Sequence, residues 1–70
     1  MMEKLADTLD QLQAKENNGR GVSCVRGIVS ELRRYNLSGA QAIANNEYDK
    51  IRSYPEIKAV VDENFGTEDK

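Results

Sequence analysis

The chain has 70 residues and a net charge of −2, and it contains one cysteine and no histidine. This length accommodates one domain, and the slight acidic excess argues against a general polyanion binder, which needs surplus cations to neutralise phosphates. A single cysteine excludes an internal disulfide, and a zinc site without histidine would have a poor set of ligands. We therefore expect no metal and no cofactor.

The N-terminal segment places acidic side chains among its apolar residues. We therefore expect neither a signal peptide nor a membrane-spanning helix, because both need an unbroken apolar run. A lone thiol suits the reducing cytoplasm, which is the location that the sequence favours. A domain of this size buries only about 60% of the surface of its unfolded chain, so a tight protein partner or a homodimer is the expected supplement to its core.

Leucines recur at helical spacing in the first predicted helix, over residues 2–16. Leu5, Leu9 and Leu12 follow an i, i+4, i+7 pattern and form one narrow apolar seam. The segment 17–21 ends this helix, because its two asparagines and two glycines tolerate left-handed backbone conformations. The seam is a candidate for core packing or for pairing with a second copy.

The segment 22–35 carries the clearest pattern in the chain. Its apolar residues recur at three- and four-residue spacing, and its three arginines lie to one side of that apolar stripe. This arrangement predicts a helix with a core face and a cationic flank. Three arginines and one glutamate give residues 22–36 a net charge of +2, whereas two lysines and five acids give residues 55–70 a net charge of −3. Such a distribution can orient a binding partner.

A third helix is predicted over residues 39–53, after a short break at 36–38. Ser38 is a suitable N-cap, and Gln41 stands three residues later, where it completes a capping box. The break should therefore be tight, and the second and third helices should be close neighbours in space.

A fourth helix is predicted from Pro55 to about Phe65. Proline disfavours helical geometry in the residue before it and suits the first turn of a helix, and Gly66 is a natural end. We expect one helical domain over residues 1–66 and a frayed acidic tail over residues 67–70.

These elements predict an all-α fold, a small bundle of three to four short helices joined by short loops. The apolar positions on the inner faces define the expected core, which comprises Leu5, Leu9, Leu12, Val25, Ile28, Val29, Leu32, Leu37, Ile43, Ile51, Ile57, Val61 and Phe65.

Few residues offer catalytic chemistry. Cys24 is the strongest candidate nucleophile, but no activating base is evident, and a cysteine beside an apolar face usually packs as a small hydrophobe. Glu47 falls within the apolar arc of the third helix, and we expect it to form a structural ion pair with Arg26 or Arg33. The sequence therefore does not indicate an enzyme.

The favoured interpretation is a protein-binding module. A small accessory or inhibitory protein, of the kind found in phages and mobile elements, would dock on a larger cytoplasmic partner through the arginine-bearing helix. Arginine and tyrosine are the residue types enriched at interface hot spots. The predicted contact residues are Arg26, Ser30, Arg33, Arg34 and Tyr35.

The alternative is a DNA-binding helix-turn-helix over residues 38–52, because two helices joined by a short turn suit that motif. The acidic residues Glu47 and Asp49 would repel phosphates, and the turn lacks the glycine that is common in such motifs. The residues that would reach bases or phosphates are Asn45, Asn46, Lys50 and Arg52.

Overall fold

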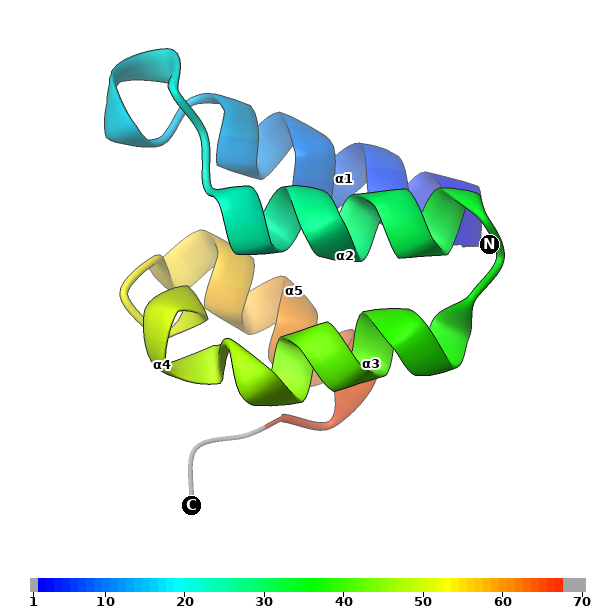
Figure 1. Cartoon of the computed structure of the whole chain (residues 1–70). Coiled ribbons are helices and arrows are strands. Elements are labelled where there is room, and N and C mark those ends of the chain that lie inside the picture. The colour runs from blue at the N-terminus through cyan, green and yellow to red at the C-terminus, as the bar shows by residue number, and fades with distance from the viewer. Residues whose placement is uncertain (1, 68–70) are drawn as a thin grey trace.

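The computed structural model describes residues 2–67, which fold into helices and contain no strand (Figure 1). The predicted all-α class is therefore confirmed. No helix in this part of the chain is long and apolar enough to cross a membrane. The elements in chain order are α1 (Met2–Ala14), the 3-10 turn η1 (Asn17–Gly19), α2 (Ser23–Arg33), α3 (Leu37–Asn46), α4 (Tyr48–Ile51) and α5 (Pro55–Phe65).

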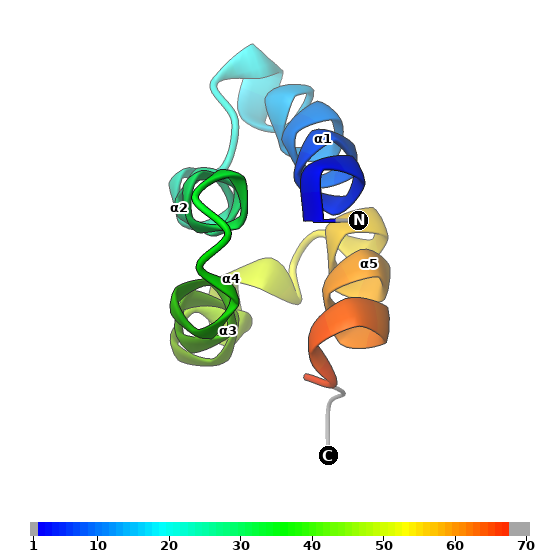
Figure 2. The same ribbon diagram turned by 90° about the vertical axis from the view of Figure 1, so that its right-hand side faces the viewer.

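The four longer helices run alternately in opposite directions and form two layers (Figures 1 and 2). Figure 2 shows α2 above α3 in one layer and α1 above α5 in the other, with α4 crossing between the layers. Short connections join neighbours in the chain, as expected for an antiparallel bundle. The connection between α2 and α3 and the N-terminal end of α1 consequently lie at the same end of the bundle.

A buried glutamine fixes the connection between α1 and α2. Gln13 is only 4% exposed, and its Oε1 atom accepts the backbone N–H of Val22 at 2.9 Å. Its Nε2 atom donates to Asp10 Oδ1 at 3.0 Å, so both ends of the amide have partners. Gly21, at φ 81°, passes directly against the Gln13 side chain. The last turn of α1 thereby positions the start of α2.

Helix α3 begins two residues earlier than predicted. Asn36 is its N-cap, and the Asn36 side chain accepts the backbone N–H of Gly39 at 3.1 Å. Ser38 lies inside the first turn, and Gln41 donates to the carbonyl of Phe65 at 3.0 Å. The predicted capping box, with Ser38 as the N-cap, is wrong. Asn36 is the N-cap instead, because its side-chain oxygen reaches the backbone N–H of Gly39, the third residue of the helix.

The predicted third helix is interrupted at Glu47, whose φ of −105° and ψ of 14° lie outside the helical range. The chain resumes as the single turn α4, which places Ile51 in the core. The prediction for α5 is confirmed: Pro55 occupies its first turn, and Gly66 ends it in the left-handed conformation at φ 65°.

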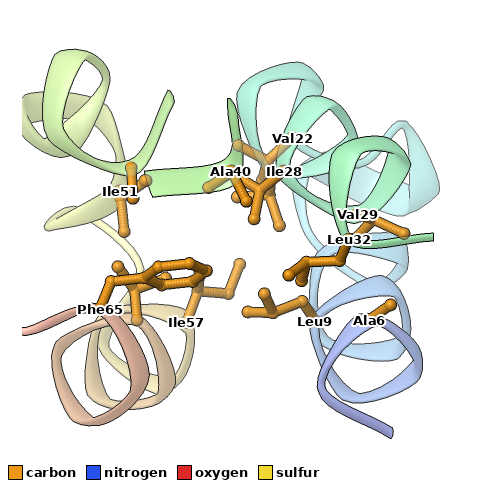
Figure 3. Close-up of a cluster of buried hydrophobic side chains, with 13 residues drawn as sticks. Ala6, Leu9, Val22, Ile28, Val29, Leu32, Ala40, Ile51, Ile57 and Phe65 are labelled. Carbon is orange, nitrogen blue, oxygen red and sulfur yellow. The ribbon is translucent and has the colours of Figure 1, made fainter. Parts of the chain in front are cut away.

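The core lies between the two layers (Figure 3). Figure 3 shows Leu9, Leu32 and Phe65 converging on this space from different helices. Alanines at helix contacts let the backbones approach closely. Leu37 is 52% exposed, so its predicted place in the core is wrong, and Leu5, Leu12 and Ile43 are only partly buried. The buried apolar residues are Ala6, Leu9, Val22, Val25, Ile28, Val29, Leu32, Ala40, Ala44, Ile51, Ile57, Val61 and Phe65.

A hydrogen-bonded cluster around Asp62 joins α4 to α5. Tyr48 Oη donates to Asp62 Oδ1 at 2.6 Å, and Lys58 Nζ donates to Asp62 Oδ2 at 2.8 Å. Thr67 Oγ1 also donates to this carboxylate, at 3.1 Å. The hydrogen bonds from Lys58 and Tyr48 lower the pKa of Asp62. Residues 68–70 of the predicted tail lie outside the described residues.

Asp62 should make the free energy of unfolding decrease as the pH falls into the acidic range. Because its pKa is lowered by folding, the carboxylate stabilises the native state above its ordinary pKa, and this contribution is lost as the pH falls through the folded-state pKa. We expect the melting temperature of Asp62→Asn to lie several degrees below wild type near pH 6, and the difference to shrink as the pH falls through the lowered pKa of Asp62. Thermal melts across this range test it, with the exposed Asp49→Asn as control. A constant difference at all pH values would contradict the assignment.

Candidate functional site

The predicted arginines have different roles in the structure. Arg26 Nη1 donates to the backbone carbonyl of Arg20 at 2.7 Å and ties α2 to the preceding loop. Arg33 Nη2 lies 3.1 Å from Asp7 Oδ1 and 3.6 Å from Asp10 Oδ2, so it joins α2 to α1. These two guanidinium groups are therefore engaged in holding neighbouring segments, although both residues are exposed.

Ser30 and Arg34 complete the exposed side of α2. Arg34 is the residue that follows the helix as its C-cap, with φ −91° and ψ 4°. Within residues 2–67 its guanidinium forms no ion pair, in contrast to that of Arg33. Arg34 is thus the arginine of α2 whose charge is available to another molecule.

Tyr35 occupies a backbone position that usually belongs to glycine. Its N–H donates to the carbonyl of Leu32 at 3.0 Å, and the N–H of Asn36 donates to the carbonyl of Glu31 at 2.9 Å. This pair of hydrogen bonds is the Schellman arrangement, which requires a left-handed residue after the helix. Tyr35 meets the requirement with φ 58°, a conformation that costs a residue with a Cβ atom about 1–2 kcal/mol.

The side chain of Tyr35 is mostly in solvent despite this backbone strain. The residue is 61% exposed, and a hydrogen bond to the Glu3 carboxylate raises the pKa of its phenol. Leu37, two residues later, is the other large hydrophobic residue that is exposed in the described part of the chain. We call Arg34, Tyr35 and Leu37 the corner surface, because they lie at the turn between α2 and α3 (Figure 1).

Replacing Tyr35 with glycine should stabilise the fold, by about 1 kcal/mol, because glycine adopts the left-handed conformation without steric cost. Tyr35→Ala keeps the unfavourable backbone conformation and removes the ring, so it should give no such gain. Urea unfolding of the three proteins measures the difference. Equal stabilities for the glycine and alanine variants would show that the backbone of Tyr35 is not strained.

The residues of the DNA-binding alternative lie on α3 and α4, away from the corner surface. Asn45 and Asn46 end α3, and Asn45 Oδ1 accepts a hydrogen bond from Gln41 at 3.1 Å. Lys50 pairs with Glu47 at 3.2 Å, and Arg52 is the C-cap of α4. Helix α4 has four residues, whereas a recognition helix presents side chains from successive turns to the major groove.

Glu47 forms an ion pair within its own segment of the chain, and its charge also acts on the thiol of Cys24. Glu47 pairs with Lys50 of the next turn, so the predicted pairing with Arg26 or Arg33 is wrong. The break after α3 places Glu47 three residues before Lys50, within reach of the lysine side chain. Partial burial, and then the charge of Glu47, raise the pKa of the Cys24 thiol, which disfavours the nucleophilic thiolate.

No cluster of three or more histidine, cysteine or carboxylate side chains suitable for a metal ion occurs among residues 2–67. A shallow depression of about 310 Å³ adjoins Cys24, between the start of α2 and the turn after α4. The chain matches no protein-family model, no curated protein and no solved structure.

Proposed function

We propose that this protein is a small non-enzymatic protein-binding module, an accessory or inhibitory protein that docks on a larger cytoplasmic partner through the corner surface. The observation that carries this proposal is Tyr35, a large side chain held in solvent by a strained backbone. Strain of this kind persists where function requires it, since a glycine would serve the turn better. Its lone cysteine suits a cytoplasmic location.

The composition of the corner surface supports a contact with protein. Tyrosine and arginine are enriched at hot spots. In the chain, Tyr35 directly follows Arg34, whose guanidinium forms no ion pair within residues 2–67, and exposed Leu37 comes two residues later. Ser30 extends the surface along α2. The engaged arginines Arg26 and Arg33 serve as the structural flank of this surface, and we expect them to contribute less to binding.

Capture of partners from a lysate of the source cells tests the proposal with Tyr35→Gly as the central variant. Wild-type protein should retain a partner in near-equimolar amount, and Tyr35→Gly should lose it. Because this variant is expected to be the more stable protein, the loss cannot be ascribed to unfolding. Retention of the partner at full strength would overturn the role of the corner surface.

A matched pair of charge deletions sharpens the experiment. Arg34→Ala should weaken capture, whereas Arg20→Ala removes the same charge from an exposed position at the opposite end of α2 and should leave capture unchanged. Equal effects would show that only overall charge matters. A mobility-shift assay with duplex DNA at micromolar protein provides the independent check: retardation that requires Lys50 and Arg52 would replace this proposal with the DNA-binding alternative.

A further inference from the structure

A groove of about 320 Å³ is lined by side chains of α1 and α5, the two helices that form one layer of the bundle (Figure 2). Two of its polar side chains, Thr8 and Asn64, each donate a hydrogen bond within their own helix. Thr8 Oγ1 donates to the carbonyl of Lys4 at 2.9 Å, and Asn64 Nδ2 donates to the carbonyl of Val60 at 2.8 Å. The residues lining the groove are Lys4, Leu5, Thr8, Val60, Glu63 and Asn64.

The groove contains two partly exposed apolar side chains, Leu5 and Val60, and two exposed side chains of opposite charge, Lys4 and Glu63. Leu5 and Val60 pack against the edge of the core and stay partly exposed. Lys4 on the α1 wall and Glu63 on the α5 wall are exposed, and neither forms an ion pair within the described chain. A partner for this surface must therefore offer an apolar strip flanked by both signs of charge.

The charges on the two helices follow a pattern that supplies such a partner. Lys4 lies in the first turn of α1 and Lys15 directly follows the helix, whereas Glu56 lies in the first turn of α5 and Glu63 near its end. The two helices are antiparallel, since Lys15 lies 4.0 Å from Glu56 at one end while Lys4 and Glu63 line the groove near the other. Each lysine therefore stands at the level of a glutamate on the opposite wall.

We propose that the groove is the interface of a symmetric homodimer. A twofold axis that runs along the groove, parallel to the two helices, places α1 of one copy against α5 of the other. The rotation does not change the position of any residue along the groove. Lys4 then meets the partner copy's Glu63, and Leu5 and Val60 of the two copies close the apolar strip, while Lys15 and Glu56 keep their pairing within each chain. The same patch serves both subunits, as an isologous interface requires.

The dimensions of this face favour a weak dimer. Helices of this length extend about 16–20 Å and pack about 10 Å apart. Two such helices side by side present a face of about 400 Å², which is about half of the roughly 800 Å² per subunit of a standard interface. We therefore expect a weak dimer, with a dissociation constant between about 100 μM and about 1 mM, that is independent of the corner surface.

Sedimentation velocity of the purified chain, from about 1 μM to about 1 mM, measures this equilibrium. Wild type should shift from monomer to dimer over the series. Lys4→Glu and Glu63→Lys each place like charges opposite one another, and each should raise the dissociation constant at least about tenfold. An equimolar mixture of the two variants restores opposite charges at both contacts, so it should dimerise while either variant alone does not.

The mixing experiment separates an intermolecular contact from an effect on folding, because both variants must be folded to pair. Circular dichroism of each variant gives a direct check, and Tyr35→Gly should dimerise like wild type. The proposal is overturned if wild type is a monomer at every concentration, or if neither charge reversal weakens the dimer. In either case the groove does not bind a second copy. The capture experiment with corner-surface variants is unaffected by either result, so the two proposals can fail separately.

Discussion

Replacing Gly21 with alanine is expected to destabilise the domain by about 3 kcal/mol. Gly21 has a φ of 81°, and a Cβ atom there would overlap the Gln13 side-chain oxygen and approach Arg26 Nη1 to 2.8 Å. Gln13 is buried and holds the N–H of Val22, so its displacement leaves a buried donor unsatisfied. The left-handed backbone adds its own penalty of about 1–2 kcal/mol. Urea unfolding measures the sum.

Gly19→Ala is the matched control for this substitution. Gly19 has a φ of 86°, similar to that of Gly21, but a Cβ atom there would meet no heavy atom within 4 Å. Gly19→Ala should cost only the conformational penalty of about 1–2 kcal/mol. The difference between the two variants isolates the Gln13 contact. Equal losses would mean that Gln13 does not determine how α2 begins.

Leu32→Ala is expected to cost about 2–5 kcal/mol, because Leu32 is fully buried between the layers and its truncation leaves a cavity (Figure 3). A core of this size supplies on the order of 3–5 kcal/mol in total. The variant should therefore be largely unfolded at 25 °C, and circular dichroism should show the loss of helix.

The same substitution at Leu37 provides the comparison. Leu37 is 52% exposed, so Leu37→Ala should change stability by no more than about 0.5 kcal/mol. If Leu37 contributes to partner binding, its truncation should weaken capture without altering the melt. A loss of stability at Leu37 as large as that at Leu32 would contradict the described packing of the turn between α2 and α3.

Helices with strong local signals could be predicted from the sequence. Pro55 and Gly66 mark the two ends of α5 because each residue has a backbone preference that few neighbours can override. The apolar stripe of α2 likewise places Val25, Ile28 and Leu32 in the core. In these segments local preference and tertiary packing favour the same conformation.

Prediction failed where a distant contact decided the outcome. Gln13 is polar, and its burial depends on the N–H of Val22 nine residues later, which no helical periodicity shows. Leu37 was expected in the core because of its side chain alone, although the cap at Asn36 makes it the first residue of α3 and directs it outward. The break at Glu47 has no glycine or proline to mark it.

The candidate site was only partly visible in the sequence. Arg34 and Tyr35 were found because arginine and tyrosine are common interface residues, whereas Leu37 was assigned to the core. The strain at Tyr35 could be inferred only after the end of α2 was known, since a left-handed residue is required there by the two hydrogen bonds from Tyr35 and Asn36. A tyrosine where most helices have glycine is the signal to seek in such turns.

The Gln13 side chain also has a consequence for cooperativity. The first turn of α2 obtains one of its boundary hydrogen bonds from the preceding helix, not from a capping side chain of its own. An isolated α2 peptide would lack this bond and, at 11 residues, would be too short to be stable in water. The smallest unit that can gain structure is therefore the hairpin of α1 and α2, whose contacts are close in sequence and favour rapid folding.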